Sequence, residues 1–442
     1  MTNVDFGRYK RIVQYFWDPE PTNDAASQLP VWCLGKQYPP RSSSISLRPI
    51  ASLNTPPHDD GLVSQLAVEP SQSETPPEST ASSVDSGLAY QDGTSEEDGG
   101  WPSEFLDDFE ARIWLTYRSN FPAIAKSLDP KAPSSMSLSV RLRSQLVDQA
   151  GFTSDTGWGC MIRSGQSLLA NAFITVRLGR DWRRGTSSSD ERKIISLFAD
   201  DAQAPFSIHK FVEHGASSCG KHPGEWFGPS ATARCIQALT NNLASSDLKV
   251  YITGDGPDIY EDSFMKIAMP DGAEFRPTLI LVGTRLGVDK ITSVYWEALK
   301  ASLQMPQSIG IAGGRPSSSH YFVGVQGTDL FYLDPHQTRN ALPLHERVEE
   351  YTEEEINSCH TRRLRKISLK DMDPSMLIAF LIRDVSDWKS WRKAVEQAPG
   401  KRVIHIADHD PAARNLASER DGAIDEVETF DDEDDEDMVL CT

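Results

Sequence analysis

The sequence predicts an α+β fold in which a helical first part is followed by a part rich in strands. A long apolar helix is predicted at 160–176, because its apolar residues recur near helical spacing. Three short apolar segments then follow one another at 308–312, 320–325 and 329–333, as expected for neighbouring strands. Helices and strands that occupy separate parts of a chain are typical of the α+β class.

The same two periodicities predict the other elements in chain order. Residues 5–17 are predicted to form a short amphipathic helix that packs on the domain, with an apolar face of Tyr9, Ile12, Val13 and Phe16. A strand is expected at 31–34, and Gly327 with Thr328 is expected to form a hairpin turn. Further strands are expected at 248–253 and 278–282, and further helices at 108–121, 291–304, 376–383 and 388–397.

Composition divides the chain into four regions. Residues 1–40 are interpreted as the N-terminal part of the domain and residues 101–400 as its main part. Residues 41–100 contain thirteen Ser, six Pro and one aromatic residue, so they are predicted to be a disordered insertion. Residues 401–442 are predicted to be an acidic disordered tail, because 421–442 hold eleven acidic residues and no basic one. A second, weaker insertion is expected at 126–150.

Charge and cysteine usage exclude several classes of protein. The net charge of −20 lies largely in the acidic tail and argues against nucleic-acid binding. The six cysteines include no Cys-x-x-Cys pair, which argues against a disulfide scaffold and against a zinc site. No apolar run approaches the ~18 residues of a membrane span, and the first residues lack the layout of a signal peptide. We therefore expect a soluble protein of the reducing cytoplasm that can visit membranes.

The segment before the long helix predicts a nucleophile. A polar, glycine-rich turn at 153–159 delivers Cys160 to the first turn of the helix. The N-terminus of a helix favours the thiolate form of cysteine, and the thiolate is the nucleophile. Gly157 and Gly159 would let a substrate approach the backbone closely. On this segment alone, a buried and inert cysteine is an equally good interpretation.

A candidate base lies at the end of the last predicted strand of the group. Asp334 and His336 are two residues apart, so an extended chain would place them on the same face. A thiol enzyme needs a base beside its sulfur and a third group that orients this base. A surface Asp-Pro-His turn is the alternative. His320 is the other candidate base, but it has no carboxylate beside it in the sequence and is interpreted as structural, whereas Asp155 is assigned to the turn.

With these motifs the chain resembles the autophagins, papain-like cysteine proteases that process the ubiquitin-like modifier of autophagy. The resemblance covers about 1–40 and 101–400. It is strongest in Thr-Ser-Asp-Thr-Gly-Trp-Gly-Cys at 153–160 and Leu-Asp-Pro-His at 333–336. Further matching strings are Val-Trp-Cys-Leu-Gly at 31–35, Thr-Tyr-Arg-Ser-Asn-Phe-Pro-Ala-Ile at 116–124, Leu-Gly-Arg-Asp-Trp at 178–182, Gly-Glu-Trp-Phe-Gly-Pro-Ser at 224–230 and Gly-Gly-Arg-Pro at 313–316.

The resemblance implies a papain-like fold in which the helical part carries the nucleophile and a mainly antiparallel sheet carries the His and Asp. It implies that Cys160, His336 and Asp334 form the catalytic set and that the Tyr117 hydroxyl is a second oxyanion donor beside the Cys160 N–H. It also implies that Trp226 and a mobile loop enclose the tail of the substrate. That loop corresponds to Gly313, Gly314, Arg315 and Pro316. No metal or organic cofactor is expected.

The resemblance further implies cleavage of the modifier after a C-terminal glycine and release of the modifier from its conjugate with phosphatidylethanolamine. The expected partners are this modifier, its conjugate and, transiently, the membrane. The protein is expected to be a monomer in the cytoplasm, at preautophagosomal membranes and in the nucleus. Two alternatives remain: a protease for another ubiquitin-like protein, and a catalytically silent adaptor that binds the modifier.

Overall fold

The computed structural model describes residues 20–23, 29–40, 98–146, 150–254, 256–272, 274–315 and 318–411. The amphipathic helix predicted at 5–17 lies outside these residues, as does the insertion predicted at 41–100 apart from its last three residues. The acidic stretch at 421–442 also lies outside them. These three expectations stay predictions.

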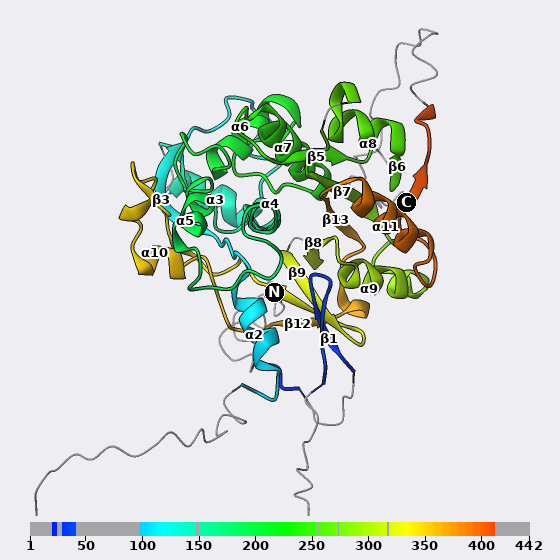
Figure 1. The fold of residues 1–442 in the computed structure, drawn as a ribbon. Helices are drawn as coiled ribbons and strands as arrows, with labels where there is room; N and C mark the ends of the chain where they lie inside the picture. The colour runs from blue at the N-terminus through cyan, green and yellow to red at the C-terminus, as the bar shows by residue number, and fades with distance from the viewer. Residues whose placement is uncertain are drawn as a thin grey trace, which may run out of the picture.

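A nine-stranded sheet organises the described part of the chain (Figure 1). Its strands run in the order β12-β10-β9-β8-β13-β7-β5, and β1 joins through β9 and carries β2. Only β5 and β7 are parallel neighbours within it, so the sheet is mainly antiparallel, as predicted. The strands are β1 (Val31–Cys33), β2 (Lys36–Tyr38), β5 (Lys249–Ile252), β7 (Thr278–Arg285), β8 (Ser308–Arg315), β9 (Ser318–Gln326), β10 (Asp329–Leu333), β12 (Lys366–Ser368) and β13 (Ser375–Ile382).

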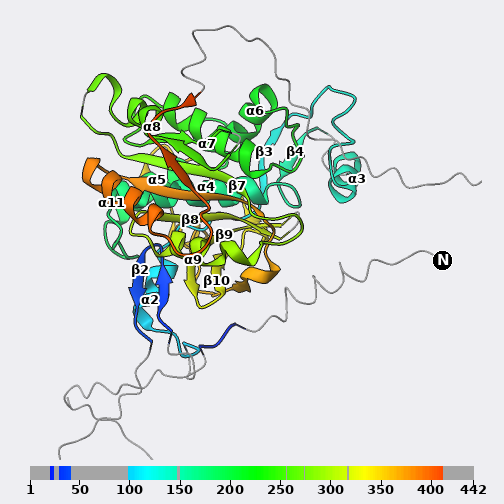
Figure 2. The ribbon, with the colours of Figure 1, turned by 90° about the vertical axis from the view of Figure 1, so that its right-hand side faces the viewer.

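Helices cover both faces of this sheet (Figures 1 and 2). On one face lie α4 (Cys160–Arg177) and α7 (Pro229–Asn242), with α2 (Ser103–Glu110), α5 (Ser188–Ser196) and α6 (Ile208–Ser218) around them. On the other face lie α8 (Glu261–Ala268), α9 (Trp296–Gln304) and α11 (Val385–Glu396). Successive strand residues therefore enter opposite cores: Leu279 and Leu281 belong to the core on the face of α4 and α7, whereas Ile280 and Val282 belong to the core on the other face.

Smaller elements complete the described fold. One three-stranded sheet joins β3 (Arg118–Ile124), β4 (Phe152–Ser154) and β11 (Arg339–Asn340), and α3 (Leu138–Leu146) lies in the connection between β3 and β4. A second pair joins β6 (Asp258–Tyr260) and β14 (His405–Ala407). The short helices are α10 (Glu353–Asn357), η1 (Pro270–Gly272), η2 (Ser293–Tyr295), η3 (Val348–Glu350) and η4 (Leu369–Asp371).

Most predicted elements are confirmed with end shifts of a few residues. The long helix α4 begins at Cys160, and the three predicted strands correspond to β8, β9 and β10. The hairpin turn between β9 and β10 is formed by Gly327 and Thr328, and Gly327 adopts a positive φ of 58°. The strands expected at 31–34, 248–253 and 278–282 and the helices expected at 291–304 and 388–397 are also present.

The helix predicted at 108–121 is wrong. Helix α2 ends at Glu110, the chain then runs without helix to residue 117, and β3 follows. Backbone N–H groups in this stretch donate to distant partners: Leu115 N–H to Ser167 Oγ (2.9 Å) and Tyr117 N–H to the Pro335 carbonyl (2.8 Å). Tertiary partners have replaced the helical hydrogen bonds, which the apolar spacing could not reveal.

The helix predicted at 376–383 is also wrong, because these residues form strand β13. This strand lies between β7 and β8 and is buried on both faces of the sheet. The sequence of a strand that is buried on both faces is a continuous apolar run, and it lacks the alternation of apolar and polar residues that identifies a half-buried strand. Such a run cannot be told from a buried helix by its periodicity.

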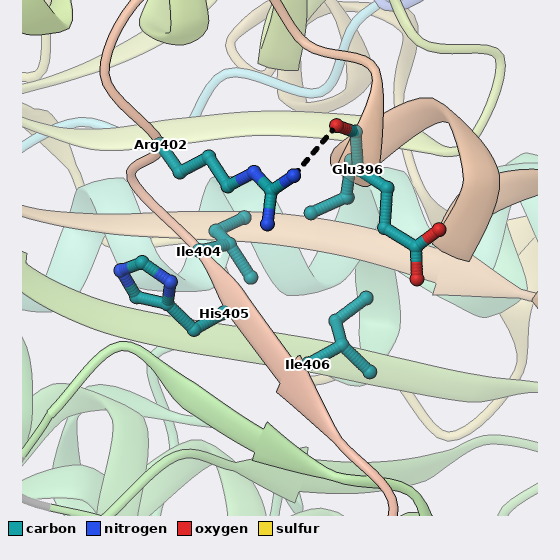
Figure 3. A pocket seen from close by; sticks show the side chains of 6 residues that line it. Glu396, Arg402, Ile404, His405 and Ile406 are labelled. Carbon is teal, nitrogen blue, oxygen red and sulfur yellow. Dashed lines mark hydrogen bonds between the residues drawn. The ribbon is translucent and has the colours of Figure 1, made fainter.

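The domain continues past residue 400, where the tail was predicted to begin. Val403 and Ile404 are buried, and β14 pairs with β6 in a parallel ladder. Arg402 donates to the Glu396 carbonyl (3.2 Å) at a hollow that Ile404, His405 and Ile406 also line (Figure 3). Among the described residues, no helix is both long enough and apolar enough to cross a membrane.

Candidate active site

The glycine-rich turn places Cys160 at the start of α4, as the sequence predicts. Gly159 is the N-cap residue, and no side chain caps the helix there. A Cβ atom at Gly159 would lie 2.5 Å from Asp155 Oδ2, so only glycine fits between the turn and the helix. Trp158 anchors the turn, since its buried indole donates to the Ser154 carbonyl (3.1 Å) and packs on Phe152. The thiol is therefore held in a defined, nearly closed place, with Cys160 1% exposed.

A buried ion pair between Asp155 and Arg163 holds this turn against α4. The Asp155 carbonyl accepts the N–H groups of Trp158 and Gly159, which is the turn role predicted for this residue. Its carboxylate does more than that prediction stated: it accepts from Arg163 Nε (2.6 Å) and from the Arg118 N–H (2.6 Å). Arg163 comes from the second turn of α4, so the ion pair ties the turn to the helix that presents the thiol.

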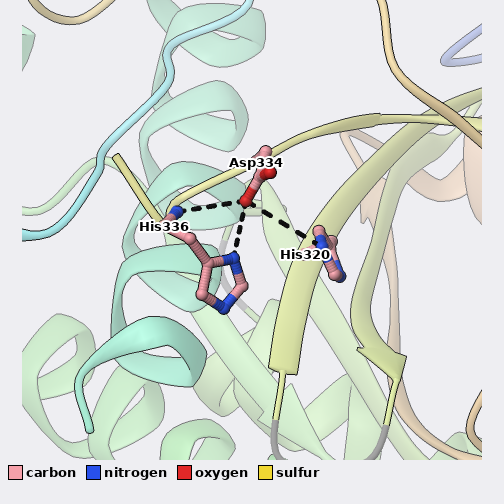
Figure 4. Close-up of side chains that lie close together, drawn as sticks. All are labelled: His320, Asp334 and His336. Carbon is pink, nitrogen blue, oxygen red and sulfur yellow. Dashed lines mark hydrogen bonds and ion pairs between the residues drawn. The ribbon is translucent and has the colours of Figure 1, made fainter. Parts of the chain in front are cut away.

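Asp334 and His336 meet directly, just after the end of β10. Asp334 Oδ1 accepts from His336 Nδ1 at 2.6 Å and from the His336 backbone N–H at 3.1 Å (Figure 4). The two residues lie in the turn after the strand and not in the strand itself. Trp114 fixes this turn by donating its indole N–H to the Asp334 carbonyl (2.7 Å). The carboxylate thus fixes the orientation of the imidazole.

The imidazole in turn interacts with the sulfur of Cys160. Burial alone would raise the pKa of the Cys160 thiol, but the hydrogen bond and charge of His336 outweigh it and hold that pKa below its usual value. The indole Nε1 of Trp226 lies 3.4 Å from the same sulfur and also favours the thiolate. The early and late parts of the chain therefore bring nucleophile and base together.

The contacts with Asp334 and Cys160 also change the pKa of His336. Burial lowers its pKa, but the hydrogen bond to Asp334 and the neighbouring thiolate raise it, to about 10. Burial alone would raise the pKa of Asp334, but its hydrogen bond with His336 and the nearby imidazole charge hold that pKa well below its usual range. The contacts therefore favour a thiolate, an imidazolium and a carboxylate in sequence.

Tyr117 lies beside this ion pair, although it does not come from a helix. Its ring packs edge-on against the His336 ring, with the centroids 5.4 Å apart. Burial and the nearby Cys160 thiolate raise the pKa of Tyr117 well above its usual value. The phenol therefore keeps its proton and can donate a hydrogen bond to an oxygen that becomes negative beside the sulfur.

The predicted substrate-binding residues divide into two groups. Trp226 is 36% exposed and stands over the sulfur, in the segment just before α7. Gly313, Gly314 and Arg315 end β8 and pair with β9, whereas Pro316 lies outside the described residues. A Cβ atom at Gly314 would collide with the Ser318 carbonyl and with His320 Nδ1, so a larger residue would displace the start of β9.

Two residues of β9 reach the site without having been assigned to it. The Ser318 hydroxyl lies 3.1 Å from His336 Nε2. His320 is buried, its Nε2 lies 3.9 Å from Asp334 Oδ1, and burial lowers its pKa to about 3, which makes it a neutral neighbour and not the base. Because residues two apart in a strand share a face, His320 at the start of a predicted strand could have indicated Ser318 as well.

His320, Asp334 and His336 also satisfy a simple geometric test for metal ligands. Their candidate ligand atoms lie within 4.8 Å of one another. However, Asp334 Oδ1 and His336 Nδ1 already bind each other at 2.6 Å, and a metal held by these two atoms would have to break that hydrogen bond. The donor set therefore fits an oriented imidazole better than a metal site.

Comparisons with known proteins agree with this arrangement. The peptidase C54 catalytic domain matches residues 102–394. A probable cysteine protease atg4 of Sclerotinia sclerotiorum is 70% identical over 100% of both chains. One from Botryotinia fuckeliana is 70% identical over 99% of this chain and 100% of its own. Cysteine protease ATG4 of Pyricularia oryzae is 53% identical over 99% and 98%. The chain therefore belongs to the peptidase C54 family of papain-like cysteine proteases.

Proposed function

We propose that this cysteine protease acts in autophagy, where it cleaves a ubiquitin-like modifier after a C-terminal glycine and releases the modifier from phosphatidylethanolamine. The single observation that best supports hydrolysis is the continuous contact from Asp334 through His336 to the Cys160 sulfur. The family membership supports the class of substrate.

In the acylation step, the Cys160 thiolate attacks the carbonyl carbon of the terminal glycine. The carbonyl oxygen becomes negative, and we assign its stabilisation to the Cys160 backbone N–H and the Tyr117 hydroxyl. His336 gives its Nε2 proton to the departing nitrogen, which leaves as the amine of the downstream peptide or of phosphatidylethanolamine. A thioester between Cys160 and the modifier remains.

In the deacylation step, a water molecule enters the place that the amine has left and hydrolyses the thioester. His336 is now neutral and takes a proton from the water as its oxygen attacks the thioester carbon. The sulfur leaves as thiolate, the new carboxylic acid loses the second proton of the water to solvent, and the modifier departs with a free C-terminal carboxylate. The Asp334 carboxylate holds His336 in the same orientation in both steps, so each of the three side chains ends the cycle in its starting protonation state.

A glycine at the cleavage site fits the surroundings of the sulfur. The Trp226 indole lies beside Cys160 on one side, and the glycines at the end of β8 lie opposite the first residues of β9. A channel with a flat aromatic wall admits a chain without side chains and excludes larger residues sterically. We assign Trp226, Gly313, Gly314, Arg315 and Pro316 to this channel. The same proposal places the protein, as a monomer, in the cytoplasm, at preautophagosomal membranes and in the nucleus.

The direct test is cleavage of two substrates: the fungal autophagy modifier with a C-terminal tag, and the same modifier conjugated to phosphatidylethanolamine on vesicles. We expect the wild-type protein to process both and Cys160→Ser to process neither while still binding the modifier. Ubiquitin with the same tag is the matched control and should stay intact.

Each alternative gives a different result in this test. Faster cleavage of tagged ubiquitin than of the autophagy modifier would show that the substrate class is wrong. Binding without cleavage by the wild-type protein, together with no labelling of Cys160 by a thiol-reactive modifier probe, would identify a silent adaptor.

A further inference from the structure

Helix α3 exposes a stripe of leucines to solvent. Leu138, Leu142 and Leu146 follow one another at steps of four and are 65%, 54% and 68% exposed. The buried residues of the helix are Val140 and Ser144. At about 100° per residue, these two lie on the side of the helix directly opposite the leucines.

This arrangement inverts the usual amphipathic pattern. A surface helix ordinarily turns its largest apolar side chains toward the core, whereas α3 buries a serine and exposes three leucines. Leu128, in the loop before the helix, is 99% exposed as well. A grouped set of exposed apolar side chains marks a contact surface more often than isolated ones do. The leucine stripe therefore needs a partner.

Basic side chains border the stripe. By the same angular step, Arg141 lies on one side of the three leucines and Arg143 on the other. Residues 126–146 contain four basic residues and one acidic residue, a net charge of +3, in a chain whose net charge is −20. The region that exposes the leucines is thus locally basic in an otherwise acidic protein.

The helix is attached to the turn that carries the nucleophile. Arg143 donates to the Thr156 carbonyl (3.2 Å), and a Cβ atom at Gly157 would lie 3.4 Å from Val140 Cγ2. Lys126 donates to the Ser144 carbonyl (2.6 Å), so a second contact holds the same C-terminal half of the helix. Figure 2 shows α3 at the outer edge of the molecule beside β3 and β4. The leucine stripe is therefore fixed to the rim of the site that holds Cys160.

We propose that the leucine stripe of α3 docks on an anionic lipid bilayer and brings Cys160 to conjugates held in that bilayer. Leucines bordered by arginines are typical of helices that lie in a membrane interface. Leucine is under-represented among the hot spots of protein interfaces, where Trp and Tyr are enriched, and α3 has no aromatic residue. The proposal rests on the proposed release of the modifier from phosphatidylethanolamine, a bond that lies at the headgroup level of a membrane.

Vesicle flotation tests the docking without depending on catalysis. The full chain carrying Cys160→Ala is mixed with vesicles of phosphatidylcholine and phosphatidylethanolamine, with or without phosphatidylserine. We expect flotation to require phosphatidylserine and to fall about fivefold or more when Leu138, Leu142 and Leu146 are all changed to Ser. The matched control changes three exposed apolar residues outside α3, Val288, Val294 and Leu344, to Ser and should float like the parent.

Activity assays separate this inference from the proposed function. In the otherwise wild-type protein, the triple Leu→Ser variant should cleave the soluble tagged modifier within about twofold of wild type but release it from vesicles at least about fivefold more slowly. Solubilising the conjugate in detergent should remove the difference. Equal loss on soluble and membrane substrates would show that α3 binds the modifier, and absence of flotation would overturn the proposal. If the wild-type protein floats but never releases the conjugate, the proposed function fails while the docking stands.

Discussion

Cys33 and Cys160 are almost equally buried, yet their surroundings shift the pKa values of their thiols in opposite directions. Cys33 is 0% exposed and Cys160 1% exposed. Burial, and after it the charge of Asp108, raise the pKa of Cys33 to about 12. Burial acts on Cys160 in the same sense, but His336 reverses the result and leaves its pKa below the usual value. The cost of burying a thiolate is thus common to both sites, and the main difference is the group beside the sulfur, which is Asp108 at Cys33 and His336 at Cys160.

The comparison shows what makes a buried cysteine reactive. A carboxylate next to a thiol disfavours its ionisation, whereas an imidazolium next to it favours ionisation. Asp108 is itself held by Arg112, Arg180 and Arg183, so its charge is a structural feature of the core around β1 and α2. The two cysteines have nearly the same solvent exposure, so the nearest ionised side chain, a carboxylate at Cys33 and an imidazolium at Cys160, contributes most to the difference between their pKa values.

The largest expected effect comes from removing the charge that distinguishes the two sites. In His336→Gln, Cys160 loses its imidazolium partner and should behave like Cys33, a buried thiol with a raised pKa. We expect modifier cleavage to fall by about 10³-fold or more, because a thiol enzyme without its base loses both activation and proton transfer. The rate of Cys160 alkylation by iodoacetamide at pH 7 should fall as well.

Mass spectrometry of the alkylated protein can follow both cysteines in one sample. Cys33 should stay unmodified in the folded wild type and in the variant. Alkylation of Cys160 at an unchanged rate in His336→Gln would mean that the thiolate is maintained without His336. The charge of His336 would then not be what distinguishes Cys160 from Cys33.

A smaller, graded effect is expected from pH. The pKa of Cys160 is lowered and that of His336 is raised to about 10, so the thiolate–imidazolium pair exists between these two values. As pH falls below the Cys160 pKa, alkylation and cleavage should both decline about tenfold per pH unit. As pH rises through about 10, His336 loses its proton. Cleavage should then decline because the leaving amine receives no proton, while alkylation of the thiolate continues.

The two pH profiles must therefore separate on the alkaline side. Rates of tagged-modifier cleavage and of iodoacetamide labelling, measured on the same preparation, provide the check. If both rates instead rise together up to about pH 9, Cys160 has the pKa of an ordinary thiol. His336 then does not act as the imidazolium described here.

The sequence could predict each half of this site because each half is local. The turn and helix that present Cys160 follow from one continuous segment, and Asp334 with His336 follows from a two-residue spacing. Their meeting depends on packing α4 against β8 and β9, which no local pattern encodes. Ser318 was missed for a related reason, because a serine at the start of a strand has many ordinary roles.

The two wrong helices show where local patterns fail. The stretch around Tyr117 satisfies its backbone N–H groups with distant carbonyl and side-chain oxygens, so its apolar spacing misleads. β13 is buried on both faces, which removes the alternation by which a strand is normally recognised. In both cases tertiary contacts decided the structure, and one of them places the Tyr117 hydroxyl beside Cys160.

The smallest expected effect is that of Cys33→Ala. Its thiol hydrogen bonds to Asp108, but this carboxylate keeps its arginine partners when the thiol is removed. We expect the free energy of unfolding to fall by about 1 kcal/mol, through loss of a small buried group, in a urea titration. Modifier cleavage and Cys160 alkylation should stay within about twofold of wild type. A large loss of cleavage with unchanged stability would show that Asp108 and its arginine partners influence the active site. The surroundings of Cys33 and Cys160 would then not be independent of each other.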